Sequence, residues 1–480
     1  MASISSAGIG SGLDVESLVT KLVAAERTPI TQLSKKTEGL KTELSTYGKV
    51  QSTLAALRDA ASKLTAPGTW SGALATSSDL TAVSVTAGSG AAVGNVSVEV
   101  KQLASSQTLV SGTPYANSTT VVGEGTLTVN LGTWARDVDG NPTTFTGKVD
   151  AEGAAIAPIT VTIGAGQDTL AGIRDAINGA NAGVTASIVN DATGARLTLR
   201  STASGETNGF VIEASGGLSN LAYDPRVGVT SMIQTLPAQN ARALINGIDI
   251  SSESNSLKEA IDGLNITLLK TTTIPANIAV SQDKDSIKKL ITDFTTAYNA
   301  VNALLREQTK YDSGSKTAGA LQGDSTAVAL QAQLRGIIGG TTSLAGSVGR
   351  LAEIGIEAGS DGNLKVSETK LNTATSNLDS LKKLFAALDS TDSANSGFAQ
   401  RIRAYVDGAL STDGRVSSRQ AGLQKLIENN NKNMDKLEDR ASLTEKRLRA
   451  RYSALDTQMS KLNGLSNYVT QQLAQLNKTS

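Results

Sequence analysis

A run of heptads near the carboxyl end constrains the fold more than any other feature of the sequence. From Leu423 to Leu476 an alternating four-three spacing continues without a break over sixteen positions, and eleven of them are apolar. Such spacing is typical of a coiled-coil helix, because it places the apolar side chains in one seam. At 1.5 Å per residue the segment would extend about 80 Å, too long for an isolated globule to cover, so it requires another helix. The apolar seam positions are Leu423, Ile427, Met434, Leu437, Ala441, Leu448, Leu455, Leu462, Leu465, Val469 and Leu476.

The other five seam positions are polar: Asn430, Thr444, Arg451, Gln458 and Gln472. Burying such groups costs stability unless each finds a hydrogen-bond partner. In the simpler arrangement the helix folds back on an amino-terminal helix of the same chain. In the other arrangement it pairs exchangeably with helices of other subunits. The weakened seam and the helical character of both chain ends favour the second, and the heptads alone leave both open.

The amino-terminal region predicts helices. Asp14 is placed to cap the first of them. Pro29 fits the first turn of a second, long amphipathic helix that should end before Pro67-Gly68. Residues 1–13 are small and glycine-rich, so we do not expect them to hold a shape alone.

The middle of the chain has a different composition. The stretch from Thr76 to Pro275 holds 23 of the 46 glycines and 6 of the 8 prolines, so helix-breaking residues concentrate there. Apolar residues alternating with period two predict half-buried, mainly antiparallel strands. Between two of these strands Asp168 can cap a short helix that Asn178-Gly179 ends. The alternating sets are Val96, Val98, Val100; Leu127, Val129, Leu131; Ile159, Val161, Ile163; and Leu197, Leu199.

Composition excludes most enzyme chemistry. Histidine and cysteine are absent, which removes Ser-His-Asp and Cys-His nucleophiles, imidazole or thiolate zinc sites, iron-sulfur ligation and disulfides. Lysine plus arginine total 44 and aspartate plus glutamate total 44, so no net field gathers nucleic acid or anionic lipid. Only 2 Trp, 8 Tyr and 5 Phe are present, which disfavours stacking of bases or sugars. No apolar stretch approaches the roughly 18 residues of a membrane span. We therefore expect a non-enzymatic protein without cofactor or metal that neither binds nucleic acid nor inserts into a membrane.

Three short motifs suggest ligand loops or turns. RDVDGNP (136–142) suggests a calcium loop, but its glycine comes fourth rather than sixth and Lys148 stands where the glutamate belongs, so we predict a hairpin turn. GIGSG (8–12) follows no strand and precedes no G-K-[ST], so phosphate binding is not expected there. Asp361-Gly362 predicts a two-residue turn between apolar stretches.

Five segments of the chain together carry a resemblance to a known family. They are SSAGIGSGLDVESLVTKLVAAERTPI (5–30), TLAGIRDAINGANAGVTASIVNDATGARLTLRSTAS (169–204), AQNARALINGIDISSESNSLKEAIDGLNITLLKTTT (238–273), LAEIGIEAGSDGNLKVSETKL (351–371) and RYSALDTQMSKLNGLSNYVTQQLAQLN (451–477). In this order they resemble the bacterial flagellar cap protein family, also called flagellar hook-associated protein 2. The second segment is similar to the flagellin hook IN motif found in that family.

The resemblance implies an α+β multidomain fold. Its terminal helices form a coiled-coil stalk and a helical bundle domain, and two mainly antiparallel β-rich domains are inserted between them. The implied parts are 1–40 with 430–480 as a flexible leg, 41–75 with 276–429 as the helical bundle, 76–110 with 236–275 as the inner β-rich domain, and 111–235 as the outer β-rich head that carries the IN motif.

The resemblance also implies a secreted structural cap at the distal tip of the flagellar filament. It would leave through the flagellar type III export apparatus with an export chaperone, form a homo-oligomeric ring, and promote flagellin folding and polymerisation while preventing subunit loss. An alternative of another class is an adhesin that binds host mucin or glycans through the exposed head. For the cap we expect the leg-helix seam to bind partners through Leu437, Leu448, Leu455, Leu462, Val469 and Leu476.

Overall fold

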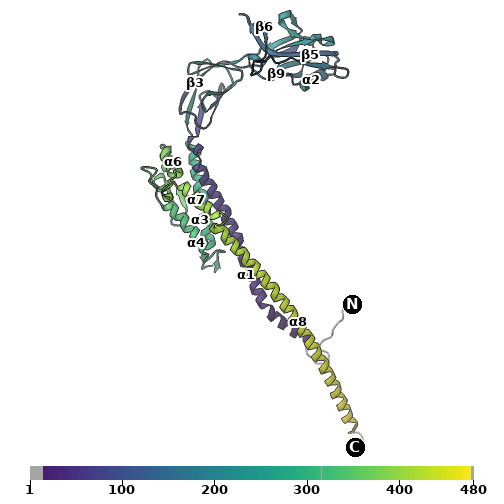
Figure 1. The fold of residues 1–480 in the computed structure, drawn as a ribbon, viewed down its shortest axis with the longest axis vertical. Coiled ribbons are helices and arrows are strands. Elements are labelled where there is room, and N and C mark those ends of the chain that lie inside the picture. Colours follow the sequence, from purple (N-terminus) through teal and green to yellow (C-terminus); the bar gives the residue numbers. More distant parts are fainter. Residues whose placement is uncertain (1–13, 315, 477–480) are drawn as a thin grey trace. The chain divides into compact units, whose positions relative to one another are not determined.

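The computed structural model describes residues 14–314 and 316–476, with the backbone alone for 475 and 476. The glycine-rich stretch 1–13, including GIGSG, lies outside the described residues. Contacts divide the chain into two units, which we call the helical unit (up to Trp70 and from Lys284 onward) and the β unit (Ser71–Asp283) (Figure 1). Among the described residues, no helix combines the length and apolarity needed to cross a bilayer.

Helix α1 (Val15–Thr65) opens the helical unit. The Asp14 carboxylate accepts a hydrogen bond from Ser17 N at 2.9 Å and caps the first turn, which confirms that prediction. The prediction that Pro29 begins a separate helix is wrong, because Pro29 lies inside α1. Proline removes one backbone donor, but this residue is exposed and α1 is packed on both sides of it, so the helix continues.

The rest of the helical unit contains short helices, two hairpins and the long carboxy-terminal helix. The β21–β22 hairpin corrects a second prediction: its last ladder pair is Ala358–Leu364, so the loop is longer than the two-residue turn at Asp361-Gly362. Asn302 Nδ2 donates to Asn363 Oδ1 at 2.8 Å and holds that residue in the loop. The elements are η1 (Pro67–Ser71), α3 (Lys284–Thr309), β19 (Tyr311–Asp312), β20 (Thr317–Ala318), α4 (Ser325–Gly339), η5 (Leu351–Ile354), β21 (Ile356–Ala358), β22 (Leu364–Val366), α5 (Glu368–Ala374), α6 (Leu378–Ala386), η6 (Ser393–Asn395), α7 (Phe398–Leu410) and α8 (Arg415–Leu476).

Asp324 joins α1, α4 and α8 in the core of the helical unit. Its carboxylate accepts from Tyr47 Oη at 2.6 Å, from Arg419 Nε at 2.8 Å, and from Thr326 N and Ala327 N at the start of α4. Only 8% of this residue is exposed. Burial alone would raise the pKa of Asp324, but the hydrogen bonds from Tyr47 and Ala327 and the charge of Arg419 hold it below its usual value. The ionised carboxylate therefore fixes the start of α8 against α1.

The β unit contains two groups of strands, each with its own apolar core. The first group is a five-stranded sheet in the order β1-β18-β3-β14-β15 and a three-stranded sheet in the order β16-β17-β2. Its strands are β1 (Ala73–Ser77), β2 (Val83–Ala87), β3 (Gly94–Gln102), β14 (Ala241–Ile245), β15 (Ile248–Ser252), β16 (Ser256–Ile261), β17 (Leu264–Leu268) and β18 (Ala276–Gln282).

The second group is a sheet in the order β12-β11-β10-β5-β6, with β7 also on β5, and a sheet in the order β13-β4-β9-β8. Strands pair antiparallel in both groups, which confirms the predicted mainly antiparallel β region. The predicted division of the chain into four parts stays a prediction. Contacts group Ser71–Asp283 as one unit, which is slightly wider than the β region predicted from Thr76 to Pro275. The strands and short helices are β4 (Thr108–Ser111), β5 (Gly125–Arg136), β6 (Pro142–Gly147), β7 (Ile159–Ile163), α2 (Leu170–Gly179), β8 (Val184–Asp191), β9 (Gly194–Ser201), η2 (Glu206–Asn208), β10 (Gly209–Ala214), η3 (Gly216–Leu221), β11 (Tyr223–Asp224), η4 (Pro225–Val227), β12 (Val229–Thr230) and β13 (Met232–Leu236).

The short helix α2 forms where the sequence places it, with one correction at its start. Thr169 rather than Asp168 is the N-cap, and its hydroxyl accepts from Gly172 N at 3.1 Å. The backbone carbonyl of Asp168 accepts from Val122 N at 2.8 Å, so this residue belongs to the extended chain before the helix. The predicted hairpin turn at RDVDGNP is confirmed, since Arg136 of β5 pairs with Pro142 of β6.

We expect Asp324→Ala to lower the free energy of unfolding of the helical unit by about 3 kcal/mol, because the arginine and the tyrosine hydroxyl it binds lose their shared acceptor in the interior. Tyr47→Phe should cost about 1 kcal/mol. Urea unfolding of the full chain, followed by helical circular dichroism, measures both. Asp379→Ala is the control, because Asp379 is exposed.

The contribution of Asp324 should also depend on pH. Its pKa is lower in the folded chain than in the unfolded one, so the stabilisation is present above about pH 4 and is lost as pH falls through the folded pKa. The difference in unfolding free energy between Asp324→Ala and the unchanged chain should therefore shrink on acidification from about pH 7 to about pH 3. If the difference in unfolding free energy is the same at both pH values, the ionised carboxylate of Asp324 is not the source of the stabilisation.

Candidate functional site

Helices α1 and α8 pack side by side in opposite directions (Figure 1). Side-chain pairs fix the direction, because residue numbers rise along one helix as they fall along the other. The pairs are Glu43 with Arg419, Arg27 with Glu438, and Glu16 with Arg449. The carboxy-terminal helix thus folds back on an amino-terminal helix of its own chain, the simpler of the two arrangements left open by the heptads.

The seam of α8 is apolar at both ends of this pairing. At one end Leu423 and Ile427 join the core that includes Leu40 and Leu44 of α1. At the other end Val15, Val19 and Val23 of α1 are buried and pack against Leu448 and Tyr452 of α8. The second patch is small, so the outer end of the pair rests on few apolar contacts.

An ion pair flanks the outer patch. Arg449 Nη2 donates to Glu16 Oε1 at 2.8 Å and Arg449 Nε donates to Glu445 Oε1 at 3.0 Å. The hydrogen bonds from Arg449 hold the pKa of Glu16 below its usual value. Because these side chains are largely exposed, the pair orients the two helices more than it stabilises them.

The five polar seam positions differ in how deeply they are buried. Asn430 is buried, and its Nδ2 atom has no hydrogen-bond partner among the described residues, so it carries the burial cost expected of a polar seam residue. Thr444 is half-buried. Arg451, Gln458 and Gln472 are exposed and carry no such cost. The seam is therefore weakened inside the pairing mainly at Asn430.

Beyond the outer patch most large apolar side chains of α8 are exposed. Helix α1 begins at Val15, so no described part of α1 remains to cover α8 past Tyr452. We call the exposed leucine and valine side chains of residues 455–473 the tail stripe. They are exposed by 42% at Leu455, 59% at Leu462, 60% at Leu465, 47% at Val469 and 58% at Leu473.

The six predicted partner-binding residues fall into three classes. Leu437 and Leu448 are half-buried within the helical unit. Leu455, Leu462 and Val469 are exposed in the tail stripe. Leu476 ends α8, and its side chain lies outside the described residues. Whether any of the six binds a partner stays a prediction.

The heptad positions of the predicted seam do not include Leu473, although its side chain belongs to the tail stripe. The heptad spacing has a period of 3.5, whereas a straight helix without a partner keeps 3.6 residues per turn. Along a 3.6-period face Leu473 follows Leu455, Leu462 and Val469. The 3.6-period face was therefore the signal that could have found it.

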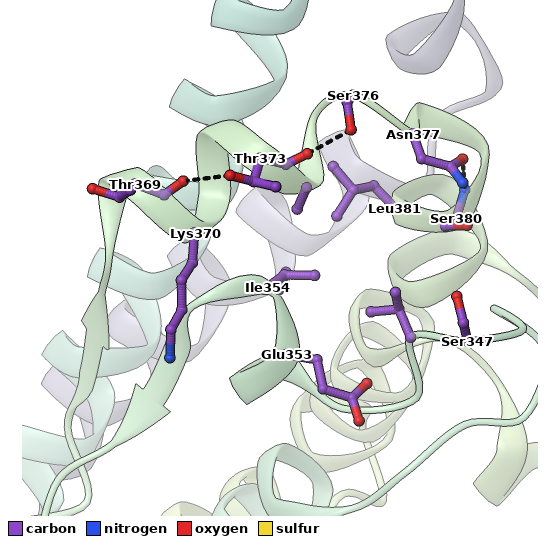
Figure 2. A pocket seen from close by; sticks show the side chains of 12 residues that line it. Ser347, Glu353, Ile354, Thr369, Lys370, Thr373, Ser376, Asn377, Ser380 and Leu381 are labelled. Atoms are coloured by element: carbon purple, nitrogen blue, oxygen red, sulfur yellow. Dashed lines mark hydrogen bonds between the residues drawn. The ribbon is translucent and has the colours of Figure 1, made fainter.

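A hollow of about 420 Å³ beside α5 and α6 does not supply a competing site. Figure 2 shows two of its hydroxyl groups in local hydrogen bonds: Thr373 Oγ1 donates to Thr369 O and Ser376 Oγ donates to Thr373 O. The Glu353 carboxylate accepts from Gly349 N at 2.7 Å, and Lys370 pairs with Glu357. These groups maintain the local fold and do not converge on a common point.

Leu448→Asp should raise amide exchange in the first turns of α1 by about tenfold, which corresponds to about 1.4 kcal/mol lost from the outer patch. Leu462→Asp should leave exchange there unchanged, because this side chain lies in the tail stripe. Hydrogen exchange of the full chain, followed by mass spectrometry, compares the two variants. Equal changes in amide exchange for the two variants would contradict a boundary between the covered and the exposed part of the seam near Tyr452.

Comparisons with known proteins agree with this architecture. Family models described as flagellar hook-associated protein 2 N-terminus and C-terminus match residues 11–107 and 238–464, and the flagellin hook IN motif matches residues 144–203. Flagellar hook-associated protein 2 of Escherichia coli K12 is 32% identical over 98% of this chain and 98% of its own length. That of Salmonella typhimurium LT2 is 30% identical over 100% of both chains.

Solved structures give the same result. The crystal structure of the flagellar cap protein FliD D1-D2-D3 domains from Escherichia coli matches with a TM-score of 0.60 and 30% identity. The match covers 79% of this chain and 99% of that chain. The predicted α+β multidomain fold is confirmed, and the chain belongs to the flagellar hook-associated protein 2 family.

Proposed function

We propose that this protein is a structural cap of the bacterial flagellar filament. Several copies assemble as a ring at the distal tip, and each extends the end of α8 into the filament end. Family membership supports the cap role. The tail stripe supports this mode of attachment, because it is a helical apolar face that no described residue of α1 covers.

The tail stripe suits pairing with another helix. Its side chains recur at helical spacing on one face of α8, so a helix of the filament end can pack against all of them at once. Full burial of a leucine side chain contributes roughly 1.5 to 3 kcal/mol, so each side chain of the stripe adds a substantial part of that amount.

The attachment also has to be reversible. Adding one flagellin subunit displaces one α8 end, which then binds again at the next position. Gln458, Gly464 and Gln472 lie in the same stretch of α8 and reduce its apolar area. A short stripe interrupted in this way binds more weakly than a continuous leucine seam. This weakness fits repeated release.

The remaining parts of the proposal follow from the family. The partners are other copies of this chain, flagellin, and the type III export apparatus with an export chaperone, and the protein acts outside the cell. By guiding flagellin at the tip the cap promotes its folding and polymerisation and prevents subunit loss. The protein acts by binding and carries out no catalysis.

No particular observation favours the adhesin alternative. In the β unit Trp134 packs with Phe145 and Tyr223 at ring-centroid distances of 4.8 Å and 6.2 Å. These rings pack in the core of the second group of strands rather than forming a platform for a sugar.

The combined change Leu455→Asp, Leu462→Asp and Val469→Asp should abolish filament growth, because three charges replace the apolar contacts. The fold should persist, since all three side chains are exposed. A cap-deficient strain that carries the variant is scored for filament length and for flagellin released as monomer.

Ser453→Asp, Ser460→Asp and Asn467→Asp form the matched control. These residues have the same seven-residue spacing, are exposed, and lie on the opposite face of the same helix. The control strain should grow normal filaments. Normal filaments from the stripe variant, with equal secretion of both variants, would overturn the proposal.

A further inference from the structure

Two carboxylates share one guanidinium at the inner end of the α1–α8 pair. Arg419 of α8 donates from Nε to Asp324 Oδ2 at 2.8 Å and from Nη2 to Glu43 Oε2 of α1 at 3.4 Å. The side chain of Asp324 is almost fully buried, and those of Glu43 and Arg419 are only 29% and 35% exposed. One positive and two negative charges therefore meet where water has limited access. We call these three residues the Arg419 joint.

The two carboxylates of the Arg419 joint are unequally supplied with donors. Besides the short bond from Arg419, Asp324 accepts from Tyr47 Oη and from two backbone N–H groups at the start of α4. Among the described residues the Glu43 carboxylate accepts the single long bond from Arg419. An ionised carboxylate with so few donors is poorly compensated for the water it has lost. Glu43 is therefore the negative charge in excess.

The environment drives the two carboxyl groups apart. Burial raises the pKa of Glu43; the positive charge of Arg419 opposes this effect, and the negative charge of Asp324 adds to it. Within residues 14–314 and 316–476, Arg419 of α8 and Asp324 of α4 are the charged groups that act on this carboxyl. The pKa of Asp324, in contrast, lies below its usual value. Over a range of mildly acidic pH, Asp324 is therefore ionised while Glu43 carries a proton.

We propose that Glu43 makes the Arg419 joint pH-sensitive, so that uptake of one proton by Glu43 holds the start of α8 more firmly against α1. Without the proton, two carboxylates face one guanidinium and a negative charge remains unbalanced. With the proton, one carboxylate balances one guanidinium. The inference does not depend on the proposed cap role.

The sign of this effect is opposite to that of Asp324. The pKa of Glu43 is higher in the folded chain than in the unfolded one, so the folded chain binds the proton more tightly. Stability is therefore gained as pH falls through the folded pKa of Glu43. The contribution of Asp324 is lost only at lower pH. The joint is strongest between these two titrations.

Glu43→Gln imitates the protonated side chain at every pH. At about pH 7.5 the variant should unfold at a higher urea concentration than the unchanged chain, because the unbalanced charge is gone. The difference should shrink as pH falls to about 4, where Glu43 of the unchanged chain is protonated as well. Helical circular dichroism of the full chain measures both midpoints. A midpoint equal to or below that of the unchanged chain at about pH 7.5 would overturn the proposal.

Glu38→Gln is the matched control on the same helix. Glu38 lies five residues before Glu43 on α1 and is exposed. The substitution removes the same charge, so the urea midpoint should stay nearly unchanged at both pH values. If it rises as much as for Glu43→Gln, the gain reflects the overall charge of the chain and the proposal is wrong.

Asp324→Asn tests whether the two carboxylates compete for Arg419. The Oδ1 atom of Asp324 accepts from Tyr47 and from the start of α4, whereas Oδ2 accepts from Arg419. Asparagine keeps an oxygen for the first set and replaces the second oxygen by an amide nitrogen, which cannot accept. Arg419 is then free to bind Glu43, so Glu43→Gln should no longer raise the urea midpoint. An equal gain with and without Asp324→Asn would exclude the competition.

The protonation itself can be followed by carbon-13 NMR of the full chain with labelled glutamate carboxyl groups. The Glu43 signal is the one that Glu43→Gln removes. Its titration midpoint should lie above the value of about 4.3 for an unperturbed glutamate, and Asp324→Asn should lower it. A midpoint at or below about 4.3 in the unchanged chain would contradict the proposal.

Discussion

The antiparallel packing of α1 against α8 joins the two ends of the chain, and the rest of the helical unit depends on it. Helices α3 and α7 pack against α1, and Asp324 at the start of α4 binds both Tyr47 of α1 and Arg419 of α8. A buried carboxylate with several donors tolerates little displacement of its partners. The relative position of the two long helices is therefore fixed at the Asp324 end and depends on a small apolar patch at the other.

The unequal reach of the two helices produces the candidate functional surface. Helix α8 has 62 residues and α1 has 51, and α1 begins beside Tyr452. Beyond that point α8 keeps the apolar periodicity of a paired helix without a described partner. The same sequence pattern thus gives a covered seam over one length and an exposed apolar stripe over the next.

Much of the secondary structure was predictable from local sequence patterns. The long terminal helices, the cap at Asp14, the antiparallel strands and the hairpin at 136–142 follow from periodicity and turn chemistry, which act over a few residues. The errors arose where distant contacts overrode local preference. Pro29 continues a helix because α1 is packed on both sides of it, and the loop at 359–363 is held open by Asn302 of α3.

The sequence by itself determined that the chain ends are helical, that the inserted region is antiparallel β, that histidine and cysteine chemistry is absent, and which family the chain resembles. Only the tertiary structure decided which leucines of the seam are covered. Coverage depends on where the partner helix begins in space, and that position follows from contacts between residues about 400 apart in the chain, such as Arg27 with Glu438. Periodicity encodes a face that needs burial, whereas the long-range fold decides what buries it.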